Sequence, residues 1–345
     1  MSASISTNAQ SGSYYEPSYT IGPYNLTDGA SDGNNARDLL FAQAVLNPNA
    51  TRSVKFHPFP WYSGSNPEKY RDFEWTWRVN ISDFTGPNTT KNETRAGAPL
   101  IDPHLALTTY DFRWPGGGNL SDQVGGHGTT DAVCISAAAA YTWPGNLTNR
   151  YTEGDVDSAD CGTVLGAACR DAILRNGTSD RRSCSGPETA WNLLPECADS
   201  FGYAQQLTRR LDPELFPTVL TFDINRNNGT RANPDRGRGN DTRVPGNPNL
   251  ASGSGFFAFN EFPRNDTNLT GYYEATDRFH VVLLSTMLPN GDGGGYQGGA
   301  ALMCMRVNTT KVEWEGPESA GMHAAGLGAV ATAVVGVTMM LAWIM

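Results

Sequence analysis

The chain has few charged residues and very little lysine. Only 17% of its 345 residues are charged, and four of its 25 basic residues are lysine. Its formal net charge is −10 at pH 7. An acidic chain of this kind lacks the basic surface that neutralises the phosphates of a nucleic acid. We therefore expect no nucleic-acid partner.

The signature motifs of several enzyme classes are also missing. The chain has no G-x-S-x-G nucleophile elbow, no P-loop and no H-E-x-x-H zinc motif. The five histidines are scattered singly and no C-x-x-C pair occurs, whereas zinc sites bring ligands together at close spacing. We expect no metal and no cofactor, and the sequence favours a protein that is not an enzyme.

Two further functions would depend on carboxylates, namely glycoside hydrolysis and calcium binding. Glycoside hydrolases use two carboxylates that a sequence can place on separate strands, and the candidate pair here is Asp223 in LTFDIN and Glu261 in FNEF. The acidic run GDVDSADC does not fit an EF-hand calcium loop, because Asp160 takes the place of the required glycine. It predicts a solvated turn, with Asp160 capping the helix that follows.

A signal peptide is missing from the printed N-terminus. MSASISTNAQSGSYYEPSY contains neither a basic region nor the apolar run that follows it in a secretory signal. Other features of the chain, described next, require secretion. We therefore predict that a signal-encoding segment lies upstream of Met1.

Acceptor sequences for N-linked glycans are abundant. Thirteen Asn-x-Ser/Thr sequons occur, whereas the asparagine, serine and threonine content gives about four by chance. The predicted glycosylation sites are Asn25, Asn49, Asn80, Asn88, Asn92, Asn119, Asn146, Asn176, Asn228, Asn240, Asn265, Asn268 and Asn308. The excess predicts passage through a glycosylating secretory pathway.

The C-terminus is a long apolar run. The last 22 residues, from Ala324, carry no charge, and as a helix they extend about 33 Å, enough to span a bilayer. No basic residue follows the run, unlike in most single-pass anchors. Small residues, a spacer and an apolar tail are what a glycosylphosphatidylinositol (GPI) signal requires, which predicts attachment at Ser319. A retained transmembrane helix is the alternative.

Seven segments predict strands. In FEWTWRVNIS, apolar residues alternate with polar ones, so Trp75 and Trp77 are predicted to lie in the core and Asn80 on a solvated polar face. RFHVVLLSTML has apolar residues on both faces of a strand, which predicts a central strand. The other segments begin at His104, Asp131, Thr218, Gly255 and Gly299. The pattern predicts a mainly antiparallel β-sandwich or jelly-roll.

A cysteine-rich helical insert, about residues 158–212, interrupts the strands. Residues 160–177 show helical periodicity over about four turns. The six cysteines are Cys134, Cys161, Cys169, Cys184, Cys197 and Cys304, an even number typical of disulfides in an oxidising compartment. They allow fifteen pairings. Antiparallel packing of the return segment favours Cys161 with Cys197 and Cys169 with Cys184, leaving Cys134 with Cys304.

The remaining segments complete the domain organisation. Residues 1–50 are polar and predict a partly disordered arm, residues 51–315 a single β-rich ectodomain, and residues 316–345 the anchor signal or transmembrane tail. Residues 225–249 contain five arginines, with an RGRG element but no interleaved aromatic residue to stack on bases. They favour a mobile surface loop over residues 225–253.

The cysteines stand in a recognisable string: Val133-Cys134, Asp160-Cys161, Val164-Leu165, Cys169, Cys184, and Pro195-Glu196-Cys197 through Phe201. This string resembles a family of uncharacterised fungal secreted or GPI-anchored glycoproteins, over roughly residues 73–307. The resemblance implies a disulfide core and surface anchoring but no activity.

The sequence thus predicts a non-catalytic glycoprotein on the extracellular face of the plasma membrane or in the cell wall. Its predicted partners are the membrane, through a lipid anchor or C-terminal helix, and cell-wall polysaccharide. A secreted carbohydrate-active enzyme on a jelly-roll scaffold is the alternative.

Overall fold

The structure is a computed structural model that describes most of the predicted ectodomain. The described residues are 18–24, 43–86, 99–124, 133–138, 143, 145–155, 157–176, 184, 187, 189–202, 219–224, 250–260, 269–290 and 295–310. Within them the protein is mainly β, with two antiparallel sheets and three disulfides. Ser319 and the apolar C-terminus lie outside the described residues.

All seven predicted strands are present, and two further strands join them. The strands are β1 (Ser18–Tyr24), β2 (Ala50–Phe56), β3 (Trp75–Thr85), β4 (His104–Arg113), β5 (Val133–Ala138), β6 (Val219–Asp223), β7 (Gly255–Asn260), β8 (Phe279–Pro289) and β9 (Tyr296–Arg306). Strand β2 has a weak sequence signal, because only Val54 and Phe56 are buried apolar residues in it.

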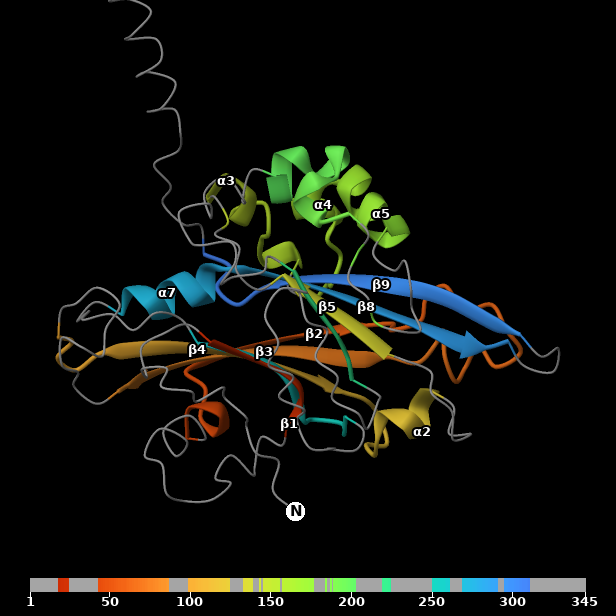
Figure 1. Ribbon diagram of the computed structural model, residues 1–345, viewed down its shortest axis with the longest axis horizontal. Helices are drawn as coiled ribbons and strands as arrows, with labels where there is room; N and C mark the ends of the chain where they lie inside the picture. Colours follow the sequence, from red (N-terminus) through yellow and green to blue (C-terminus); the bar gives the residue numbers. More distant parts are fainter. Residues whose placement is uncertain are drawn as a thin grey trace, which may run out of the picture.

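The two sheets face each other across a shared core (Figure 1). One sheet has the strand order β1-β7-β4-β3-β2 and the other β6-β5-β8-β9. As the sequence predicted, β8 is a central strand, paired with β5 on one side and β9 on the other. Trp75 and Trp77 are fully buried between the sheets, which confirms their predicted place in the core.

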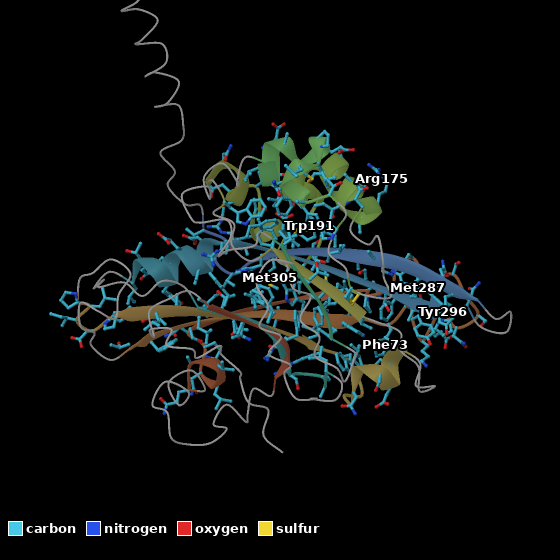
Figure 2. All side chains as sticks on the ribbon, in the orientation of Figure 1. Phe73, Arg175, Trp191, Met287, Tyr296 and Met305 are labelled. Atoms are coloured by element: carbon cyan, nitrogen blue, oxygen red, sulfur yellow. A yellow bond between two sulfur atoms is a disulfide. The ribbon has the colours of Figure 1, made fainter. Side chains whose placement is uncertain are left out.

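A layer of short helices covers the other face of the four-stranded sheet (Figure 1). Its elements are α3 (Gly145–Thr148), η2 (Glu153–Asp155), α4 (Gly162–Leu165), α5 (Ala167–Asn176), η3 (Trp191–Leu193), η4 (Pro195–Cys197) and the π-helical turn η5 (Ala198–Gly202). Trp191, labelled in Figure 2, is fully buried where this layer meets the sheet. A second hydrophobic core therefore lies between Phe279, Val281 and Leu283 of β8 and the helices.

The predicted four-turn helix is instead two helices, so that prediction was wrong in its continuity. Gly166 separates α4 from α5 and has φ +82°, in the left-handed region that favours glycine. Asp160 Oδ1 accepts a hydrogen bond from the backbone N–H of Gly162 at 3.0 Å, although the N-cap residue itself is Cys161. The break changes the direction of the chain between Cys161 and Cys169.

The disulfides connect different cysteines from those predicted. Cys134 is bonded to Cys184, Cys161 to Cys304 and Cys169 to Cys197. The predicted bond between Cys134 and Cys304 cannot form, because the two residues lie at different heights along the intervening strand β8. Cys134 pairs with Ser285 of that strand and Cys304 with Val281. Four residues along a strand are about 13 Å, well beyond the reach of a disulfide.

Two segments predicted to be loose are partly fixed. The polar arm 1–50 supplies β1, which pairs with β7 at the edge of the five-stranded sheet. The predicted loop 225–253 lies outside the described residues up to position 249, but its last residues are anchored. Leu250 is fully buried, and its carbonyl accepts the backbone N–H of Leu120, the first residue of α2 (Leu120–Val124), at 2.7 Å.

We predict that the bond between Cys161 and Cys304 stabilises the protein more than the bond between Cys169 and Cys197. The first joins residues 143 positions apart and the second residues 28 apart, so the first removes more chain entropy from the unfolded state. Replacing the first pair by serine should lower the free energy of unfolding by about 2–5 kcal/mol. Replacing the second pair should lower the free energy of unfolding by about 1–2 kcal/mol less than replacing the first.

Chemical denaturation of the two double-serine variants measures this difference. Equal denaturation midpoints for both variants would contradict the ranking. Peptide mapping of the oxidised protein provides an independent check on the three connectivities.

Candidate functional site

Of the two carboxylates proposed for glycoside hydrolysis, Asp223 belongs to a described strand and Glu261 does not. Asp223 is the last residue of β6, at the edge of the four-stranded sheet, with its backbone opposite Cys134. Glu261 directly follows β7, in the other sheet, and lies outside the described residues. The pair therefore stays a prediction.

The sequons differ in accessibility. Of those on described residues, Asn49, Asn119, Asn146 and Asn176 are exposed, and Asn308 is half-buried. Asn80 is only 4% exposed, so its predicted position on a solvated face was wrong. The outer face of β3 carries polar residues, as the alternation indicated, but Asn80 and Ser82 on it are buried and Thr76 and Arg78 are half-buried.

Helix α7 (Thr270–Asp277) packs on β3 and β4 (Figure 1). Ionisable and aromatic side chains lie on this helix and on the strands that it contacts. The C-terminal end of this helix is held by Arg306 on β9. The fully buried Arg306 side chain donates from Nη2 to Asp277 Oδ1 at 3.0 Å and to the Thr310 carbonyl at 2.8 Å. Asn308 Nδ2 also donates to Asp277 Oδ1, at 2.8 Å.

Burial lowers the pKa of Arg306, and the hydrogen bond and charge of Asp277 oppose that shift. An unpaired buried guanidinium would be costly, so Asp277 compensates a charge that the fold takes out of water. This contact fixes the end of α7 relative to the four-stranded sheet.

Asp83 and His104 form the hydrogen-bonded pair of the site. His104 Nδ1 lies 2.9 Å from Asp83 Oδ2, and the side chains are 27% and 13% exposed. The backbone N–H of Asp83 donates to Asn49 Oδ1 at 2.8 Å, which fixes the strand beside the pair. A carboxylate at Nδ1 orients the imidazole and leaves Nε2 as its other hydrogen-bonding atom.

Two tyrosines of α7 continue the surface from this pair. The Tyr272 and Tyr273 rings meet edge to face, with centroids 5.5 Å apart. Tyr273 is 54% exposed, whereas Tyr272 is partly buried against the core. Burial raises the pKa of Tyr272, and the negative charge of Asp83 contributes in the same direction. We call Tyr273, Tyr272, Asp83 and His104 the α7 strip.

A second histidine lies deeper, between the two sheets. The Tyr110 hydroxyl on β4 and His280 Nδ1 on β8 are 2.9 Å apart. Burial lowers the pKa of His280 to about 3, with a further contribution from the positive charge of Arg278. Burial also raises the pKa of Tyr110. Both groups are therefore neutral at physiological pH, and the pair is a hydrogen bond that joins the sheets.

The α7 strip combines the partly exposed imidazole of His104 with the exposed aromatic ring of Tyr273. Such a combination suits a ligand rich in hydroxyl groups, because carboxylates and imidazoles bind hydroxyls and ring faces pack on apolar C–H groups. Among the described residues, no three His, Cys, Asp or Glu side chains are grouped to hold a metal ion.

The α7 strip was not among the predicted sites. One signal was present: Asp83 interrupts a run of buried apolar residues at alternate positions of β3, after Val79 and Ile81. A carboxylate on the core face of a strand needs a partner. Which partner it has, His104, depends on the pairing of β3 with β4.

No protein-family model, curated protein or solved structure matches the chain. The resemblance to fungal surface glycoproteins therefore depends on the cysteine string alone. Among the described helices, none has the length and apolar character needed to cross a membrane.

We predict that His280 makes the protein less stable in acid. The unfolded state binds a proton near pH 6.5, whereas folded His280 does so near pH 3, so its contribution is complete above pH 6.5 and decreases as the pH falls towards 3. The maximum slope from this group is about 1.4 kcal/mol per pH unit.

Replacing His280 by Gln, which cannot titrate but keeps a hydrogen-bonding group beside Tyr110, should reduce that slope. Urea denaturation of both proteins between pH 7 and pH 4 measures it. Parallel stability curves for the two proteins would contradict the prediction.

Proposed function

We propose that the protein is a non-catalytic glycoprotein of the cell surface or cell wall, held by a GPI anchor or a C-terminal helix and contacting polysaccharide. The observation that carries this proposal is the disulfide bonding of all six cysteines. Disulfides of this kind persist in oxidising compartments. The exposed asparagines Asn119, Asn146 and Asn176 support it, since surface residues can carry glycans.

The finer description of the fold belongs to the same proposal. We interpret the two facing sheets as a β-sandwich or jelly-roll and the helical layer as an insert between β5 and β6. The described helices of this layer extend from Gly145 to Gly202. Two disulfides tie the layer to the sheet, through Cys134 on β5 and Cys304 on β9. This arrangement and the cysteine string are consistent with the uncharacterised fungal family.

The α7 strip is the surface we propose for polysaccharide contact. Tyr273 supplies the exposed ring and contacts Tyr272, and His104, oriented by Asp83, supplies a partly exposed hydrogen-bonding group. Tyr296, at the start of β9, is similarly exposed (52%) but lies towards the opposite end of the molecule from α7 (Figures 1 and 2). It provides a matched control of the same residue type.

The alternative, a secreted carbohydrate-active enzyme, has its own specific feature. A carboxylate that orients a partly exposed histidine is an arrangement suited to general acid–base catalysis. Asp223 and Glu261 remain the candidate residues for a two-carboxylate mechanism. Product release from a polysaccharide, rather than retention alone, would identify the enzyme.

We expect the full chain, expressed behind a functional signal peptide, to be retained on at least one polysaccharide of a cell-wall glycan array. Tyr273→Ala should weaken retention roughly three- to tenfold, because an aromatic contact contributes about 0.5–1.5 kcal/mol. Tyr296→Ala should leave retention unchanged. Equal losses in both variants would contradict the proposed surface, and soluble products abolished by His104→Ala or by Asp223→Asn would favour the enzyme.

The mode of anchoring has a separate test. Phosphatidylinositol-specific phospholipase C should release the protein from intact cells if a glycolipid has replaced the tail after Ser319. If the protein stays on the cells and acylation of the inositol has been excluded, the anchor is a transmembrane helix and not a lipid. Failure of the chain to reach the surface would refute the surface assignment.

A further inference from the structure

A buried carboxylate lies on the outer face of the five-stranded sheet. Asp111 on β4 is fully buried, and Arg78 on β3 holds it through one edge of its guanidinium, with Nε and Nη2. Arg78 Nε donates to Oδ1 and Nη2 to Oδ2, each at 2.8 Å. Arg113 Nε lies farther away, 3.7 Å from Oδ1. The ionised carboxylate therefore depends on these partners for the hydrogen bonds that water would otherwise supply.

Asn80 completes the coordination of this carboxylate. Its Nδ2 donates to Asp111 Oδ2 at 3.2 Å and to Thr109 Oγ1 at 3.4 Å. Its Oδ1 accepts a hydrogen bond from Thr51 Oγ1 at 2.9 Å. The amide thus links β2, β3 and β4 with both of its polar atoms.

The whole sequon Asn80-Ile81-Ser82 is buried. Ile81 is in the core, and Ser82 Oγ donates to the Ala44 carbonyl. The three residues lie in the middle of β3, with Thr51 of β2 and Thr109 of β4 paired on either side of Asn80. A glycan at Nδ2 would replace one of its two hydrogens, although both are used in hydrogen bonds, and would need space beside a side chain that is only 4% exposed.

We infer that Asn80 is a structural residue whose sequon is unmodified in the folded protein, and that glycan transfer to Asn80 prevents the native pairing of β2, β3 and β4. This inference deepens the proposed function, because it depends on passage through a glycosylating pathway. The exposed acceptors Asn119, Asn146 and Asn176 carry the glycans instead.

Glycopeptide mass spectrometry of the protein released from the cell surface tests the modification. Enzymatic deglycosylation in ¹⁸O-water marks each formerly glycosylated asparagine. Label at Asn119, Asn146 or Asn176 with none at Asn80 is the expected result, and any Asn80 glycopeptide should be confined to chains retained inside the cell. Equal occupancy of Asn80 in the surface protein would overturn the inference.

A second experiment tests the structural role of Asn80 in protein that carries no glycan. In protein made without N-glycosylation, Asn80→Asp places a carboxylate beside Asp111 and should reduce the yield of folded protein at pH 7 by on the order of tenfold or more. The loss should be smaller near pH 4, where a carboxylate can protonate. The matched change Asn176→Asp, at an exposed helix end, should have little effect.

These two arms separate the possible failures. An absence of glycan at every sequon would refute the proposed glycoprotein, while a large and pH-dependent effect of Asn80→Asp would still establish Asn80 as structural. Equal effects of Asn80→Asp and Asn176→Asp would overturn the inference even if the other sequons are glycosylated.

Discussion

The four-stranded sheet has to be covered on both faces, and the arrangement of the other layers follows from this constraint. Its central strand β8 is buried at successive positions, with Val282 and Leu284 facing the five-stranded sheet and Val281 and Leu283 facing the helices. A sheet with two apolar faces requires a layer on each side. The helical layer is thus a structural requirement of β8, whatever else it does.

Disulfides hold that helical layer because its helices are too short to be stable alone. Isolated helices of one to three turns are marginal in water. The bonds of Cys134 and Cys304 fix the layer to β5 and β9, and the bond between Cys169 and Cys197 joins α5 to η4 within it. Cross-links of this kind suit an extracellular protein, where reduction does not remove them.

Several buried polar side chains are paired with partners on distant elements. Asp111 is matched by Arg78 and Asn80, Arg306 by Asp277, and Tyr110 by His280. Each of these pairs joins two elements in one relative position, whereas apolar contacts are not directional. The same requirement places Asp83 beside His104 under α7, where partial exposure turns a structural pair into a candidate binding surface.

The sequence by itself determined seven of the nine described strands, the burial of Trp75 and Trp77, and the central position of β8. These follow from alternation along the chain, a local property that a single segment reveals. It also showed that the cysteines form an even set, but not that Cys161 bonds to Cys304, because that pair is set by the register of β9 on β8.

Only the tertiary structure decided that Asn80 is buried and that Asp83 meets His104. Alternation shows which residues share a face, but whether that face is solvated depends on what packs against it. The partners of Asn80 lie on strands 29 residues before and after it in the chain. Contacts across such distances depend on strand pairing and leave no periodic trace in the local sequence.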